Sequence, residues 1–158
     1  MERAAIIGTK AIIVFFVALS LLGQIVVIPF LASEVATEYP EFAHLKIIGI
    51  IGCVAIVASV QVALLCTWRL VTLVKRDTIF QPAAFRIVNI LIASFLTVGV
   101  LAFIGNAIVA FAGAGHPSIL LLSTVTISAS LGIALLLVIM KELLRKASTY
   151  AHDLTEVI

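Results

Sequence analysis

Residues Ile87–Ala110 read IVNILIASFLTVGVLAFIGNAIVA, an uninterrupted run without Asp, Glu, Lys, Arg or His. An α-helix needs about 20 predominantly apolar residues to cross the hydrocarbon core of a bilayer, and this run is long enough. It is also about twice as long as a strand of a membrane β-barrel, and its apolar residues do not alternate with polar ones. We therefore expect Ile87–Ala110 to form a transmembrane helix.

Three further runs have the same character, namely Ala11–Leu31, Ile47–Trp68 and Ser118–Met140. The composition of the chain agrees, because 63% of the 158 residues are hydrophobic, 11% are charged and the mean hydropathy is +1.31. Soluble domains are nearer half apolar and a quarter charged. The sequence predicts an all-α membrane protein, in which residues 1–158 form a single domain built as an antiparallel bundle of four transmembrane helices.

The basic residues are distributed unevenly around these spans. Nine of the ten lie before the first span, between the second and third, or after the fourth, and Lys46 alone lies between the first two. By the positive-inside rule, both termini and the central loop are cytoplasmic. The net charge of +2 is too small to favour direct binding to nucleic acid.

Several helix ends can be predicted from prolines and from their absence. Tyr39-Pro40 should break a helix in the first outer loop, and Gln81-Pro82 should open the third span. The stretch CTWRLVTLVKR, Cys66–Arg76, has no helix breaker, so the second span should continue beyond the membrane. The tail after Met140 also lacks Gly and Pro and should prolong the fourth span.

The sequence offers little chemistry for catalysis or transport. No span contains an ionisable residue, although transporters usually keep one on the transport path. The chain has no H-E-x-x-H motif, glycine-rich phosphate loop or Ser/His/Asp set. His44 and His116 lie in the outer loops without metal-site spacing, and a metal shared between them is the alternative to ordinary surface histidines. We expect a non-enzymatic protein without catalytic residues, cofactor or metal.

Amides are the strongest polar groups inside the spans. Gln24, Gln61 and Asn106 are the ones that bear on function, and their simplest role is hydrogen bonding between helices. The alternative is an intramembrane pocket formed by these three residues. Such a pocket would suit a sensor or immunity protein that binds a lipid, a quinone or an antimicrobial compound.

Small residues recur at three- and four-residue spacing in three spans. They are Gly52, Ala55, Ser59 and Ala63, then Gly99, Ala102 and Gly105, and finally Thr124, Ser128 and Gly132. Such stripes let helix backbones approach closely. We expect them to pack the bundle together, whereas a stripe that faced outward would serve a homo-oligomer or a larger membrane complex.

The stretch Thr67–Phe95, TWRLVTLVKRDTIFQPAAFRIVNILIASF, resembles the cytoplasmic signature of a family of small four-span bacterial membrane proteins catalogued as a domain of unknown function. The shared features are an aliphatic helix end, the basic pair Lys75-Arg76, Phe80 and a helix that bears Arg86. Many members have Ser or Thr after the phenylalanine as a helix cap, whereas this chain has Gln81. Members are often encoded beside helix-turn-helix regulators. The resemblance implies a membrane-linked regulatory role in the bacterial cytoplasmic (inner) membrane.

The leading hypothesis is an interaction protein that docks a partner through its basic cytoplasmic loop, residues 69–86. Arg69, Lys75, Arg76 and Arg86 would supply positive charge, and Phe80 would supply an apolar anchor. The partner would be a cytoplasmic regulator or a larger membrane complex. The competing explanation is that these charges only orient the chain and attract anionic lipid, at about 1 kcal/mol per basic residue.

Overall fold

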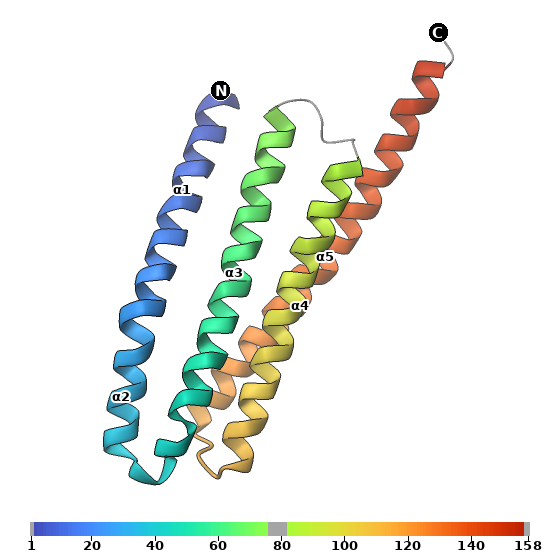
Figure 1. Ribbon diagram of the computed structural model, residues 1–158. Helices are drawn as coiled ribbons and strands as arrows, with labels where there is room; N and C mark the ends of the chain where they lie inside the picture. Colours follow the sequence, from blue (N-terminus) through green and yellow to red (C-terminus); the bar gives the residue numbers. More distant parts are fainter. Residues whose placement is uncertain (1, 76–81, 157–158) are drawn as a thin grey trace.

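The computed structural model describes residues 2–75 and 82–156, and this part of the chain is helical without any strand (Figure 1). In chain order the elements are α1 (Glu2–Leu22), the π-helix η1 (Gly23–Val27), α2 (Ile28–Glu38), the 3₁₀-helix η2 (Pro40–Leu45), α3 (Lys46–Lys75), α4 (Pro82–Phe111) and α5 (Pro117–Glu156). The first three elements follow one another as a single rod, so four long rods run alternately up and down. The predicted all-α fold with four antiparallel helices is confirmed.

Four stretches of the described chain are long and apolar enough to cross a membrane. They are Ile6–Glu38, Pro40–Lys75, Pro82–Phe111 and Pro117–Thr149. Each contains one of the predicted spans and extends beyond it at both ends. This is the build of a multi-pass membrane protein.

The predicted helix ends agree with the structure. Helix α2 ends at Glu38, directly before Tyr39-Pro40, and α4 begins at Pro82. Proline is tolerated in a first turn because the N–H that it lacks would have no partner there. Helix α3 continues to Lys75 and α5 continues to Glu156, so both run beyond the predicted spans.

The first rod contains a π-turn, which the sequence analysis did not predict. The π-helix η1 ends at Val27, two residues before Pro29. Proline has no N–H to donate and its ring clashes with the carbonyl group four residues earlier. A wider π-turn before Pro29 accommodates both effects within a continuous helix. Gln24 lies inside this turn.

Helix α4 is the centre of the bundle. It packs against α3 on one side and α5 on the other, whereas α1 and α2 pack against α3. In the described residues the backbones of α1 and α5 do not approach each other, and Figure 1 shows α1 along the left side and the end of α5 at the upper right. The bundle is therefore open between its first and last rods.

The core lies along α4 and is built largely from small side chains. The buried residues among those described are Ile13 of α1, Ala63 and Cys66 of α3, Ala84, Val88, Leu91, Ser94, Val98 and Ala102 of α4, and Ser130 and Ala134 of α5. Ala63, Cys66 and Leu91 form one cluster, against which Phe95 and Leu137 pack. Many large apolar side chains outside this core are exposed, as expected for helices that face hydrocarbon.

The stripe predicted for the fourth span does not face the bundle. Thr124, Ser128 and Gly132 are exposed, and α5 instead buries Ser130 and Ala134. Positions two residues apart on a helix differ by about 200° in direction, so the stripe and the buried residues lie on opposite faces. The prediction that this stripe packs the bundle is therefore wrong. Gly99 of α4 does pack closely, since a Cβ at Gly99 would lie 3.6 Å from Cβ of Ser130.

The two ends of the bundle differ. Both chain termini lie at the end that also contains the last turns of α3 and the first turns of α4, and we call it the terminal end (Figure 1). The opposite end contains η2 and the link between α4 and α5, and we call it the turn end. At the turn end, α4 closes with a Schellman motif, in which the N–H of Gly113 donates to Ala110 and the N–H of Ala114 donates to Val109. Gly113 has φ +72°, a conformation that favours glycine.

Candidate functional site

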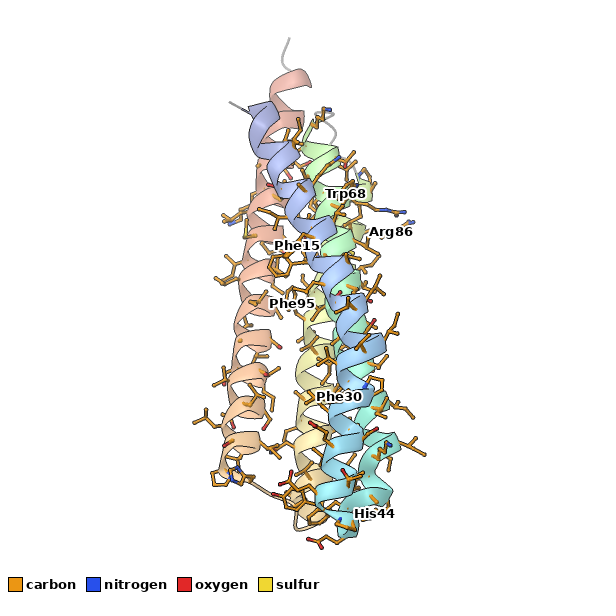
Figure 2. All side chains as sticks on the ribbon, turned by 90° about the vertical axis from the view of Figure 1, so that its left-hand side faces the viewer. Phe15, Phe30, His44, Trp68, Arg86 and Phe95 are labelled. Atoms are coloured by element: carbon orange, nitrogen blue, oxygen red, sulfur yellow. The ribbon has the colours of Figure 1, made fainter. Side chains whose placement is uncertain are left out.

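The terminal end presents basic side chains on two adjacent helices. Arg69 and Lys75 belong to the last turns of α3, and Arg86 belongs to the first turns of α4; all three are exposed. Helices α3 and α4 pack together, so the structure brings these three residues to one end of one helix pair. Arg86 and Trp68 lie near the same end in Figure 2. Arg76 and Phe80, the other two residues of the predicted docking loop, lie outside the described residues.

A contact between α1 and α3 adds to this end. The ammonium group of Lys10 lies 4.8 Å from the ring centroid of Trp68, within the range of a cation–π interaction. Lys10 and Trp68 are both half-buried. This pair could not be predicted from the sequence, because the two residues are far apart in the chain and no local pattern relates them.

The fourth rod carries a second basic segment at the terminal end. Helix α5 continues for 16 residues after Met140, and Arg145 and Lys146 in this extension are exposed. Figure 1 shows the end of α5 projecting past the other helices. This segment therefore offers the same kind of charge as α3 and α4, on a different helix.

Two of the three predicted intramembrane amides meet between α1 and α3. Nε2 of Gln61 donates to Oγ of Ser20 at 2.9 Å and to Oε1 of Gln24 at 3.1 Å. Nε2 of Gln24 donates to the carbonyl oxygen of Val54 at 3.2 Å. Gln61 thus uses both of its amide N–H groups, and Gln24 uses one N–H group and its carbonyl oxygen. We call Ser20, Gln24 and Gln61 the polar latch.

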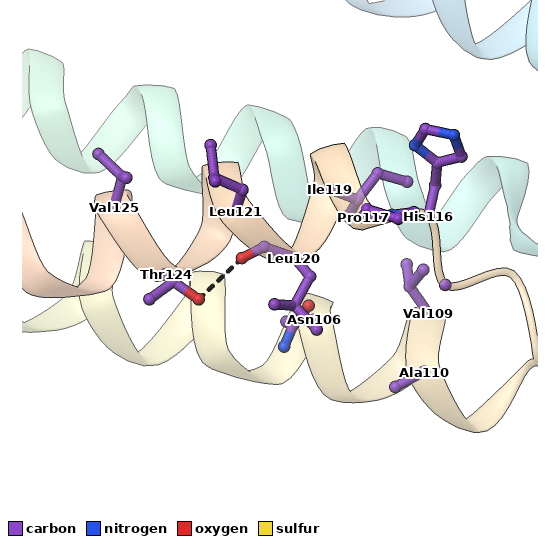
Figure 3. Close-up of a pocket in the computed structure, with 11 residues that line it drawn as sticks. Asn106, Val109, Ala110, His116, Pro117, Ile119, Leu120, Leu121, Thr124 and Val125 are labelled. Atoms are coloured by element: carbon purple, nitrogen blue, oxygen red, sulfur yellow. Dashed lines mark hydrogen bonds between the residues drawn. The ribbon is translucent and has the colours of Figure 1, made fainter.

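Asn106 is not part of the polar latch. It is half-buried in α4 and lines a cavity of about 580 Å³ between the end of α4 and the beginning of α5 (Figure 3). Gln24 and Gln61 do not line this cavity. The structure therefore separates the predicted group of three amides into an interhelical hydrogen-bond network and one cavity residue.

His44 and His116 each make a local contact at the turn end. Nδ1 of His44 donates to the carbonyl oxygen of Glu41 at 3.1 Å. Nδ1 of His116 accepts the N–H of Ser118 at 3.3 Å, so His116 caps the beginning of α5. Within residues 2–75 and 82–156, no group of three or more His, Cys, Asp and Glu residues is placed to hold a metal ion.

The turn end also contains a cavity that no sequence pattern indicated. Its volume is about 610 Å³, and its wall includes Tyr39, Lys46 and His116. It shares Val109, Gly115, His116 and Ile119 with the cavity that Asn106 lines. The residues of its wall come from distant parts of the chain, which is why it could not be found without the fold.

One of the comparisons with known proteins identifies a family for this chain. The model of the family DUF2975, described as a protein of unknown function, matches residues 30–158. The match begins in α2 and includes α3, α4 and α5 in full, with Arg69, Lys75 and Arg86. No curated protein and no solved structure gives a significant match. The chain therefore belongs to the DUF2975 family.

Proposed function

We propose that this protein is a non-enzymatic interaction protein of the bacterial cytoplasmic membrane, oriented with its terminal end in the cytoplasm. In this proposal the loop between α3 and α4 docks a cytoplasmic protein that has an acidic surface. Lys75 and Arg76 supply the charge and Phe80 supplies the apolar anchor. The partner's class is a regulator, as the resemblance to proteins encoded beside helix-turn-helix regulators suggests.

The observation that carries the proposal is the group of exposed cations on α3 and α4. Arg69, Lys75 and Arg86 are exposed on helices that pack together, and none of them makes an ion pair in the described part of the chain. Exposed and unpaired cations are available to a partner. A basic surface of this kind also speeds association with an acidic protein and selects against basic ones.

The length of α3 supports the same proposal. Its 30 residues span about 45 Å, whereas the hydrocarbon core is about 30 Å thick. Helix α3 begins at Lys46, at the turn end, so the excess length lies toward Lys75. The basic residues are thereby held on a rigid helix near the water, and rigid elements position binding residues more precisely than loops do.

The competing explanation predicts a different pattern of mutational effects. Basic residues on the cytoplasmic side also set membrane orientation and attract anionic lipid, at about 1 kcal/mol each. That effect depends on the number of charges and not on which helix carries them. The chain offers a matched comparison, because Lys75-Arg76 and Arg145-Lys146 are both adjacent basic pairs on the same side of the spans.

The test is affinity purification of the full chain from native membranes in mild detergent, with mass spectrometry of the proteins that co-purify. One variant carries Lys75→Glu and Arg76→Glu, and the control variant carries Arg145→Glu and Lys146→Glu. We expect the wild type and the control to retain one acidic protein at a fixed ratio, and the first variant to lose it. Equal loss in both variants, or retention in both, would show that these charges act through orientation and lipid alone.

A further inference from the structure

The cavity of about 610 Å³ at the turn end is formed by five parts of the chain. Its wall consists of Ala32, Val35 and Ala36 of α2, Tyr39, Phe42 and Leu45 in and beside η2, Lys46 and Gly49 of α3, Val109 of α4, and Gly113, Ala114, Gly115, His116 and Ile119 from the link to α5 and its first turn. Cavities of 300–1,000 Å³ are typical of small-molecule sites. This cavity is therefore of a size to hold a ligand.

The cavity exists because small residues stand where large ones would fill it. A Cβ added at Gly49, Gly113 or Gly115 would have no atom within 4 Å, when the adjacent residues and the backbone of the same helical turn are left out. Gly113 is required by the Schellman motif that ends α4, so the link there carries no bulky side chain. The open space is thus a consequence of how the two helical hairpins end.

The polar groups on the wall are hydrogen-bond donors. Of the residues on the wall, Lys46 carries an ammonium group and Tyr39 carries a hydroxyl group. Nδ1 of His116 accepts from Ser118, so in the neutral ring the proton is on Nε2, which is a donor. A wall with three donors and one positive charge favours an anion with several acceptor oxygens.

No carboxylate among the described residues is paired with the charge of Lys46. Lys46 is half-buried and makes no ion pair in the described part of the chain. The nearby glutamates Glu34, Glu38 and Glu41 are exposed, and none of them lines the cavity. Lys46 is also the one basic residue between the first two spans, so it works against the positive-inside distribution that the other nine produce. A ligand-binding role accounts for a lysine at this position.

The remaining wall is apolar and continues into the neighbouring cavity along α5. Val35, Phe42, Leu45 and Ile119 lie on it, and His116 and Ile119 are shared with the neighbouring cavity of about 580 Å³. That cavity extends along α5 past Leu121 to Thr124. The hydroxyl group of Thr124 donates a hydrogen bond to the carbonyl oxygen of Leu120 (Figure 3). An alkyl chain therefore has an apolar path that begins beside the donors.

We propose that the turn end binds a single-chain anionic amphiphile. Its carboxylate or phosphate group lies against Lys46, His116 and Tyr39, and its alkyl chain lies along the apolar wall. A free fatty acid supplies the carboxylate form and a lysophospholipid supplies the phosphate form of the same chemistry. This site is at the opposite end from the proposed docking surface, and it does not depend on that proposal.

The test is photolabelling of the full chain in nanodiscs of neutral lipid. Three probes share one diazirine-bearing alkyl chain and differ in the head group: a fatty acid, a lysophosphatidic acid and an uncharged monoacylglycerol. We expect the charged probes to label peptides that contain residues 32–49 and 113–119. Lys46→Gln should weaken labelling by the charged probes about tenfold, as expected for loss of a charge-assisted hydrogen bond, and should leave the monoacylglycerol unchanged.

Matched variants separate binding from folding. Gly49→Leu fills the cavity and should abolish labelling by all three probes. The control is Gly105→Leu, because Gly105 is also exposed but lines neither cavity; this variant should be labelled as the wild type is. Lys46→Arg should restore labelling, and Lys75→Gln should behave as wild type. A stronger signal from the fatty acid or from the lysophosphatidic acid identifies the source of the anion. Equal labelling by charged and uncharged probes, or equal behaviour of Lys46→Gln and Lys75→Gln, would overturn the proposal.

Discussion

Helix α4 and helix α1 are held in the bundle by different kinds of contact. Helix α4 buries six residues between α3 and α5, among them Ala84, Ser94 and Ala102. Helix α1 buries Ile13 among its described side chains, and it is joined to α3 by the polar latch and by Lys10 over Trp68. One interface depends on close packing and the other on a few directed polar contacts.

The difference follows from the physics of association in lipid. Lipid hydrocarbon is as apolar as leucine, so burying apolar side chains drives helix association less than it does in water. Helices in lipid associate instead through close packing and interhelical hydrogen bonds. Small residues let α3, α4 and α5 approach closely. Where α1 meets α3, glutamine and serine side chains supply hydrogen bonds instead. The family match begins at residue 30, within α2, and leaves α1 outside.

Overpacking the α4–α5 interface should have the largest effect. Ala134 is 3% exposed, so Ala134→Leu has no room and should lower the free energy of unfolding by about 1–3 kcal/mol. Unfolding can be followed in a detergent titration by the fluorescence of Trp68, the single tryptophan. The control is Ala129→Leu on the exposed face of α5, which should be close to neutral. Similar losses in the two variants would mean that α5 is not packed as described.

Removing the polar latch should have an intermediate effect. Gln61→Leu deletes the donor of two hydrogen bonds, and single interhelical bonds in membranes average about 0.6 kcal/mol, with a maximum of about 1.7. We expect the free energy of unfolding to fall by about 1 kcal/mol in the same titration. Asn89→Leu is the control, because Asn89 is exposed and makes no side-chain hydrogen bond in the described structure. If both variants behave alike, α1 is held by packing and the contrast with α4 fails.

The contact between Lys10 and Trp68 should have the smallest effect. A cation–π pair at a partly exposed site contributes about 0.5–1 kcal/mol, so Lys10→Gln should cost no more than that. The emission maximum of Trp68 should shift in Lys10→Gln and should stay near the wild-type value in Lys10→Arg. An unchanged emission spectrum in Lys10→Gln would show that the two groups do not interact in the membrane.

The number of spans and most helix ends were predictable from the sequence. In lipid, backbone N–H and C=O groups can form hydrogen bonds only with each other, so a long apolar run must be helical. Prolines such as Pro40 and Pro82 mark where helices end or begin. The π-turn before Pro29 was not predicted, because a proline in a span can be accommodated in several ways. A kink, a π-turn and a break all satisfy the same local sequence.

The directions in which residues face were harder to predict. A residue's place within a span follows from counting along the chain, and Gln24, Gln61 and Asn106 were grouped because each is an amide inside a span. The side of the helix on which a residue lies depends on its neighbours, and these three residues belong to two different interfaces. The same limit explains the wrong prediction for Thr124, Ser128 and Gly132. The cavity beside Lys46 was missed because its wall joins five separate parts of the chain.

The most direct test of the proposed docking surface uses one photocrosslinking amino acid at either end of the same helix. Val74 is 49% exposed beside Lys75, and Ile47 is 69% exposed beside Lys46, so replacing either one leaves every charge in place. In native membranes, the account predicts an adduct with one acidic protein from position 74 and none from position 47. Lipid adducts alone at position 74, or the same protein adduct at both positions, would contradict it.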